Sequence, residues 1–244
     1  MTTSDIAEFL LEQIGRAKAL RLVHTASPDR AEKRLLLREW QASRLAHTHA
    51  DLLDHPKYGP AAAFFLSDLY GTKDTMRRDA ALERIYPIMS RMLSETALHT
   101  VGLAVELDAL TEELDAELLD VLVQRLGPRD QITESAYADA YRRCDNYALR
   151  KHQIDLIRQV GDDLARLVDK PLLYAALRGM RTPARLAGVG DLQEFLERGF
   201  TAFRHMEDPH PFLDAVERRE TQILERIYAR HPRPFDLDEP PVAA

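Results

Sequence analysis

The sequence has little cysteine, no long apolar run and no surplus of basic charge. Its single cysteine, Cys144, excludes an internal disulfide and a metal cluster of the Cys-x-x-Cys type. Nowhere do about 18 uncharged apolar residues follow one another, so we expect no membrane-spanning helix. Residues 1–6 contain no basic segment followed by an apolar run, which argues against a secretory signal peptide. Together these absences predict a cytoplasmic protein.

Acidic residues outnumber basic ones, 40 to 33, and the formal net charge is −7. A chain with this balance is not attracted as a whole to nucleic acid or to an anionic membrane. The densest basic segment contains Arg142, Arg143, Arg150 and Lys151. We interpret it as the solvated face of a helix, with a local basic patch as the alternative.

Sequence motifs of the common enzyme classes are also missing. The chain has no Gly-x-Gly-x-x-Gly after a strand, no phosphate-binding loop, no Gly-x-Ser-x-Gly elbow and no His-Glu-x-x-His. The sequence therefore favours no particular reaction and assigns no cofactor.

Helical periodicity dominates the chain, whereas alternating β-branched runs are nearly absent. The pattern predicts an all-α protein, a single compact bundle of about nine to eleven helices over residues 1–230. A Pro-rich tail over residues 231–244 is predicted to be mobile. A domain boundary at residues 127–130 is the alternative. The expected helices cover residues 4–22, 28–55, 60–70, 79–86, 94–110, 111–126, 133–168, 171–178, a short segment from 182, 191–206 and a last helix that begins at Pro209 or Pro211 and ends near Arg230.

Capping residues support several of these starts. Ser27, Ser94 and Thr133 each precede a helical pattern and can accept a bond from an orphan backbone amide. Asp191 and Glu194 have the spacing of a capping box.

The segment 60–70 is almost wholly apolar and has one acidic residue, Asp68. Pro60 suits its first turn, and Gly71 suits its left-handed terminator. A helix that is apolar all round is typical of a central position, so we expect Asp68 to be buried. It is either half of a structural ion pair or a functional acid, base or ligand anchor. The residues that we expect to line a ligand pocket are Asp68, His49, Arg44, Arg78 and Tyr70.

The second predicted helix contains His47 and His49. Two residues apart, they diverge by about 160° on a helix and cannot bind one metal ion together. His49 lies on the apolar side of this helix. We interpret it as a core histidine, with a metal ligand or a catalytic base as the alternative.

A third candidate site lies on the helix that begins at Ser94. Glu95, His99 and Glu106 are spaced so that they share one side of this helix. Carboxylates and a histidine on one side of a bundle helix can bind iron or manganese. The alternative is that this side simply faces water.

Aromatic residues also gather near the C-terminal end. Phe200, Phe203 and Phe212 occur near His205 and His210. Aromatic residues at helical spacing are typical of a core, and a haem or apolar-ligand pocket between helices is the alternative.

Residues Phe64 to Gly71, of pattern FFLxDLYG, followed by Arg78 and Asp79, resemble a signature of uncharacterised all-helical bacterial proteins. Residues 199–203 and 217–220 fit the same resemblance, which spans most of the chain. The resemblance implies a helical fold, and it implies no activity, cofactor or catalytic residue.

We therefore expect a non-enzymatic helical binding or interaction protein that self-associates as a homo-oligomer, using grooves between amphipathic helices. The alternative is a helical-bundle metalloprotein, with an oxidase among the candidates. A haem or apolar-ligand binder is the third hypothesis. The sequence identifies neither the ligand nor the partner.

Overall fold

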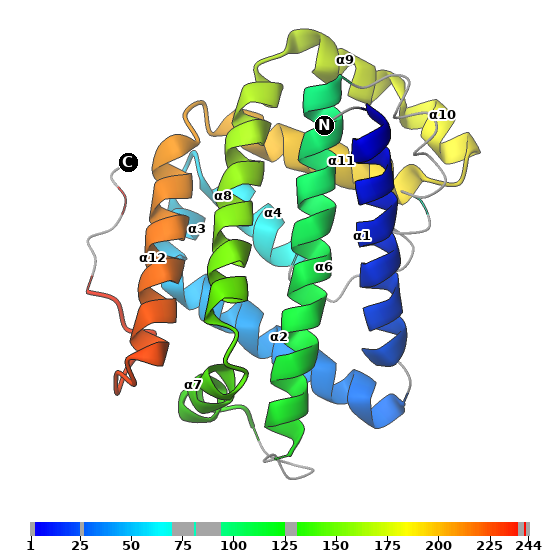
Figure 1. The fold of residues 1–244 in the computed structure, drawn as a ribbon. Coiled ribbons are helices and arrows are strands. Elements are labelled where there is room, and N and C mark those ends of the chain that lie inside the picture. Colours follow the sequence, from blue (N-terminus) through cyan, green and yellow to red (C-terminus); the bar gives the residue numbers. More distant parts are fainter. Residues whose placement is uncertain are drawn as a thin grey trace.

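The computed structural model describes residues 3–24, 27–69, 81, 94–124, 131–238 and 242. Regular structure in these residues is helical throughout, which confirms the predicted all-α bundle (Figure 1). In the described chain no helix is both long and apolar enough to span a membrane. The elements are α1 (Thr3–His24), α2 (Pro28–Thr48), α3 (Ala50–Asp54), α4 (Gly59–Phe64), the π-helix η1 (Phe65–Leu69), α6 (Glu95–Val123), α7 (Glu134–Arg143), α8 (Tyr147–Val168), α9 (Pro171–Gly179), α10 (Arg181–Leu186), α11 (Gly190–His205) and α12 (His210–Tyr228).

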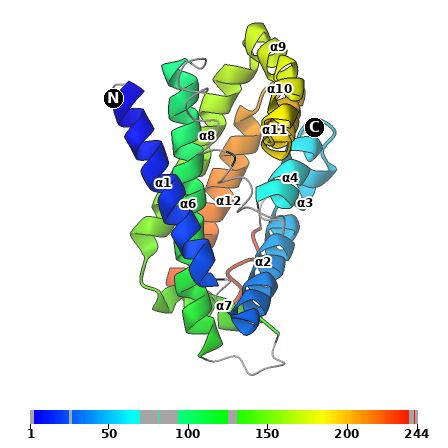
Figure 2. The same ribbon diagram turned by 90° about the vertical axis from the view of Figure 1, so that its right-hand side faces the viewer.

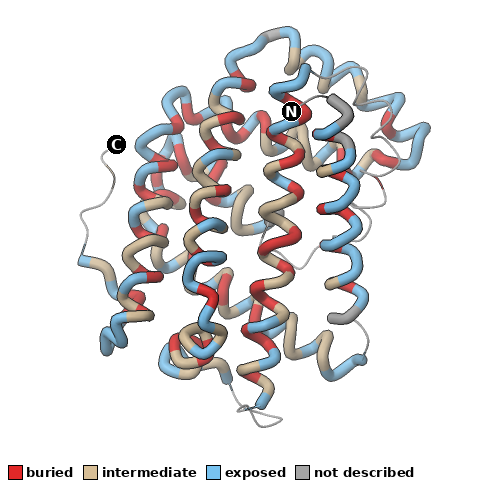
Figure 3. Tube along the Cα trace, viewed as in Figure 1, coloured by how far each residue is buried: buried red, intermediate tan, exposed pale blue. Residues whose placement is uncertain are grey.

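The long helices form two layers. Helices α1, α6, α8 and α12 lie side by side in that order (Figure 1). Helices α2, α3, α4 and α11 cover the back of this layer (Figure 2). Helix α6 contacts both α1 and α8, and it buries residues along most of its length (Figure 3). The central position in the bundle therefore belongs to α6.

Local capping chemistry sets three helix starts as predicted. The side chains of Ser27, Ser94 and Thr133 accept bonds from backbone amides three residues on, at 3.2, 3.3 and 3.2 Å. The capping box at Asp191 was wrong, because α11 begins at Gly190 and its N-cap residue is Val189. Asp191 instead lies in the first turn, where its charge still favours the positive end of the helix dipole.

Other predicted boundaries were also wrong. The two helices expected over residues 94–126 are one helix, α6, because the Thr111 hydroxyl donates to the Leu107 carbonyl within it and starts no new helix. The single pattern over residues 133–168 is broken between α7 and α8, where Asp145 has a φ of 50°. The second predicted helix ends at Thr48, and the short helix α3 follows His49.

The apolar segment 60–70 forms α4 and continues as η1. Pro60 lies in the first turn as predicted, and Ala61 and Ala62 are buried against Phe200 and Phe203. Ala63 and Ser67 are exposed, so the segment is buried on one side only and not all round. Gly71 lies outside the described residues.

The aromatic residues near the C-terminal end belong to the core, as interpreted. Phe200, Phe203 and Phe212 share one buried cluster, whereas His205 and His210 are exposed. After α12 the chain is not helical over residues 231–238, yet Phe235 is only 4% exposed. The predicted mobility of the tail stays a prediction, but this side chain anchors its first part.

Candidate ligand site

Two segments far apart in the sequence meet at one side of the core. The α2–α3 junction contains Thr48, His49 and Asp51, and α12 contains Arg219 and Glu220. His49 has backbone angles outside the helical range, with φ −115° and ψ 28°, and this break turns its side chain inward, where it is 7% exposed.

Glu220 is shared by two basic side chains. The Arg44 Nη1 atom donates to both carboxylate oxygens at 2.6 and 2.7 Å, and His49 Nε2 lies 3.0 Å from Oε1. Burial would raise the pKa of Glu220, but the charges and hydrogen bonds of Arg44 and His49 outweigh it and lower the pKa to about 2. At neutral pH Glu220 is therefore a carboxylate. The buried His49 Nδ1 atom has no hydrogen-bond partner in the described structure.

A second ion pair lies beside the first. Arg219 donates to the two oxygens of Asp51 at 2.7 and 2.8 Å, and to the Thr48 carbonyl at 3.3 Å. The Val242 amide also donates to Asp51, at 2.8 Å. The hydrogen bonds from Arg219 are the main reason that the pKa of Asp51 is lowered to about 2. These bonds join α3, α12 and the end of the chain.

Arg150, on α8, is a buried cation of a different kind. The residue is only 3% exposed. Its Nη2 atom donates to the Leu114 carbonyl at 3.0 Å, and its guanidinium lies 4.4 Å from the centre of the Tyr141 ring. Its Nε atom is buried without a hydrogen-bond partner in the described part of the chain.

Protonated hydroxyls and a carboxyl surround this arginine. Burial raises the pKa of Tyr137 and of Tyr141, so both keep their protons at neutral pH. Burial also raises the pKa of Asp115, and the attraction of Arg150 only partly offsets this. Asp115 accepts a bond from Gln41 at 2.8 Å. The residues around Glu220 and those around Arg150 together form one set, which we call the buried polar cluster. Its members are Gln41, Arg44, His49, Asp115, Tyr137, Tyr141, Arg150 and Glu220.

The other arginines that are equally buried have carboxylate partners. Arg21 contacts Asp108 and lies 3.2 Å from Glu112, and Arg219 pairs with Asp51. Among the described residues, no carboxylate oxygen lies within 4.0 Å of an Arg150 nitrogen. Arg150 is therefore a buried positive charge that no carboxylate contacts directly in the described structure, although the charge of Asp115 acts on it from a distance.

The interpretation of the segment 142–151 as a solvated face was wrong for Arg150. The break at Asp145 sets a new register for α8, in which Arg150 lies on the same side as Ile154 and Gly161. Arg150 precedes Ile154 by four residues, and Ile154 precedes Gly161 by seven. This helical spacing is a sequence signal from which the burial of Arg150 could have been predicted.

Two of the five predicted pocket residues come together. Arg44 and His49 meet at Glu220, which is not among the predicted pocket residues. The side chain of Asp68, and the whole of Tyr70 and Arg78, lie outside the described residues, so their predicted roles stay predictions.

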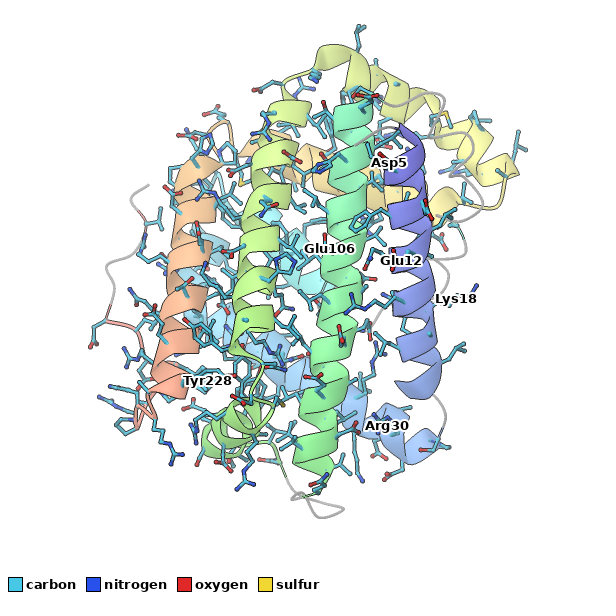
Figure 4. All side chains as sticks on the ribbon, in the orientation of Figure 1. Asp5, Glu12, Lys18, Arg30, Glu106 and Tyr228 are labelled. Carbon is cyan, nitrogen blue, oxygen red and sulfur yellow. The ribbon has the colours of Figure 1, made fainter. Side chains whose placement is uncertain are left out.

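The three predicted metal ligands do not converge. Glu95 is exposed, His99 Nδ1 lies 3.8 Å from Asp163 on α8, and Glu106 lies 3.0 Å from His152 (Figure 4). In the described ranges, no group of three or more His, Cys, Asp or Glu side chains could hold a metal ion. The metal hypothesis stays a prediction without support from these contacts.

A shallow surface groove of about 410 Å³ lies between α8 and α12. It is lined by polar side chains, and its lysine is paired with Asp155. The lining residues are Lys151, Asp214, Glu217, Arg218, Thr221 and Gln222.

A family model described as a domain of unknown function (DUF8198) matches residues 20–234, and the chain therefore belongs to that family. Neither a curated protein nor a solved structure matches the chain. The family match agrees with the resemblance to an uncharacterised family and assigns no chemistry to the buried polar cluster.

Proposed function

We propose that the protein is a non-enzymatic helical binding protein whose ligand is a small oxyanion, a carboxylate or phosphate, held by Arg150 in the buried polar cluster. One observation carries this proposal: Arg150 is the buried arginine without a carboxylate partner in the described structure, whereas Arg21 and Arg219 each have one.

The free energy of a buried charge that no carboxylate contacts supports this proposal. Burying an ion without a partner costs several kcal/mol even after the protein relaxes. An anion beside Arg150 would offset that cost, and a planar guanidinium suits carboxylate and phosphate oxygens. The Tyr141 ring lies 4.4 Å from the Arg150 guanidinium and the Tyr137 ring is next to it, so their protonated hydroxyls offer two further hydrogen-bond donors in this region.

The position of unpartnered polar atoms gives further support. The Tyr228 hydroxyl, near the end of α12, is buried without a side-chain partner in the described chain, and the Asn146 backbone and the charge of Arg150 act on it (Figure 4). The Oδ1 atom of Asn146, the N-cap residue of α8, is also unpartnered there. Buried polar atoms are normally hydrogen-bonded, so this region is suited to polar guest atoms.

Thermal unfolding and calorimetric titration test the proposal with four probes: inorganic phosphate, sulfate, acetate and succinate. We expect at least one probe to bind saturably and to raise the melting temperature, because a ligand that binds only the folded state stabilises it by mass action. Arg150→Gln should weaken that binding by about tenfold or more. The separate probes distinguish a phosphate-type from a carboxylate-type ligand.

Arg143→Gln is the matched control, because it removes the same charge from an exposed side chain on the neighbouring helix. It should bind the probe as the unaltered chain does. Equal binding by Arg150→Gln and the unaltered chain, or no saturable binding of any probe at about 10 mM, contradicts the proposal.

A further inference from the structure

Residues 170–190, which form α9 and α10, carry a charge opposite to that of the rest of the chain. They contain Lys170, Arg178, Arg181 and Arg185 and no acidic residue, a formal charge of +4 in a chain whose total is −7, so the remainder carries −11. We call this segment the basic arm. It lies at one end of the bundle, across the ends of the long helices (Figure 1).

The outward side of the basic arm is apolar. Leu172 and Leu186 are 83% and 85% exposed, the highest values among the large apolar side chains that the structure describes. Ala175, Ala176 and Gly179 are exposed on the same side of α9 as Leu172. A Cβ atom added at Gly179 would meet no atom within 4 Å, so this side is open. An apolar side of this kind is typical of a contact surface.

Its cations are mostly available. Arg181 is paired with Glu197, but Lys170 and Arg185 have no ion pair in the described structure. Arg178 approaches the Tyr174 ring, at 5.8 Å, and its charge acts on Glu197 without an ion pair to it. The basic arm therefore combines exposed leucines with cations that have no ion pair in the described structure, and it suits a partner surface that combines apolar and acidic side chains.

The outward side of α1 has these complementary properties. Leu11 is 46% exposed on the N-terminal half of this side, and Glu8 and Glu12 are exposed beside it without an ion pair in the described structure. The C-terminal half differs, because Lys18, labelled in Figure 4, is exposed on the same side four residues before Leu22, which is 58% exposed. Gly15 lies between the two leucines, and a Cβ atom there would also meet nothing within 4 Å. Beside Leu11, the missing side chain of Gly15 leaves room for a second helix to approach closely.

We propose that the basic arm docks on the outward side of α1 of a second copy of this chain. Both elements lie on the side of the molecule that faces the viewer in Figure 2, so a two-fold axis can form the contact twice. Arg178 and Arg185 of one copy then face Glu8 and Glu12 of the other, and the exposed leucines of both surfaces are buried. The excess negative charge of the remainder makes an anionic membrane or a nucleic acid the less favourable partner for the arm.

Charge reversal tests this contact through analytical ultracentrifugation of the full chain. The unaltered chain should dimerise at about 100 μM in about 50 mM salt, and the dimer should weaken as salt screens the charges at the contact. Arg185→Glu alone and Glu8→Arg alone should each weaken the dimer by about tenfold or more, since a repulsive pair then occurs at both contacts. An equimolar mixture of the two variants should dimerise as the unaltered chain does, because each contact regains opposite charges.

Arg143→Glu, with the same change of charge on an exposed side chain of α7, is the control and should leave the dimer intact. Circular dichroism establishes that each variant is folded. A monomer at all concentrations, a dimer unaffected by either reversal, or no recovery in the mixture overturns the proposal. So does a monomer that binds phosphatidylglycerol vesicles through the arm, since the arm then serves a membrane.

Discussion

At the scale of single residues, Glu220 illustrates how charge is accommodated in the core. Its carboxylate accepts hydrogen bonds from Arg44, and its Oε1 atom lies 3.0 Å from His49 Nε2. One carboxylate therefore serves two basic side chains, one on α2 and one just after it. Removing that charge leaves Arg44 buried with a poorer partner. Arg150 presents the opposite case, a buried charge that contacts a backbone carbonyl and an aromatic ring but no carboxylate among the described residues.

Glu220→Gln should therefore lower the free energy of unfolding by about 3 kcal/mol at neutral pH, since it breaks a buried ion pair while keeping the side-chain shape. The folded-state pKa of Glu220 is about 2, below its ordinary value of 4.5. Such a group stabilises the fold fully above its unfolded pKa and loses that effect as pH falls through the folded pKa. Urea unfolding should show the cost of Glu220→Gln shrinking from pH 5 towards pH 2.

The control for this prediction is Glu225→Gln, an exposed residue of the same helix. It should change the free energy of unfolding by less than about 0.5 kcal/mol at every pH. A cost of Glu220→Gln that is equally small, or one that grows as pH falls, would contradict the ion-pair interpretation.

At the scale of the elements, the packing of α8 on α12 depends on one glycine. A Cβ atom at Gly161 would lie 2.3 Å from Leu213 Cδ2 and 3.2 Å from Leu213 Cγ. Leu213 is buried in the core cluster, so it has little room to move aside. The absence of a side chain at Gly161 is what lets the two helices approach this closely.

Gly161→Ala should consequently lower the free energy of unfolding by about 1–3 kcal/mol, despite the better helix propensity of alanine. Gly15→Ala provides the contrast, because nothing lies within 4 Å of its added Cβ atom. That variant should be more stable by about 0.5–1 kcal/mol. Chemical denaturation of both variants separates the two effects, and a stabilising Gly161→Ala would show that α8 and α12 are less tightly packed than described.

Helix starts could be predicted from the sequence where the interactions that set them lie within a few residues. Ser27, Ser94 and Thr133 mark helix starts because each cap needs only an amide three residues on. The break at Asp145 was missed because an aspartate in the left-handed region has no strong local signal. That miss concealed the burial of Arg150, the residue on which the proposed function rests.

At the scale of the whole molecule, the candidate site joins the two ends of the sequence. His49 and Glu220 are 171 residues apart, and Asp51 and Arg219 are 168 apart. Helical periodicity places each residue on one side of its own helix, but it cannot say which other helix will cover that side. Arg44 and His49 were therefore chosen from the sequence, whereas their partner Glu220 emerges only from the packing of α12 on α2.

Contacts between residues far apart in the sequence also make the segment after α12 part of the stable fold. Phe235 packs against Trp40 and Tyr137, with ring centres 5.6 and 6.0 Å away, and so covers the contact of α2 with α7. Phe235→Ala should lower the free energy of unfolding by about 3 kcal/mol, because it leaves a cavity beside two aromatic rings. A chain ending at Arg230 should lose at least as much stability in urea unfolding, whereas Arg233→Ala, an exposed neighbour, should change little. If the shortened chain were as stable as the full one, the tail would be a separate mobile segment, as the prolines alone had suggested.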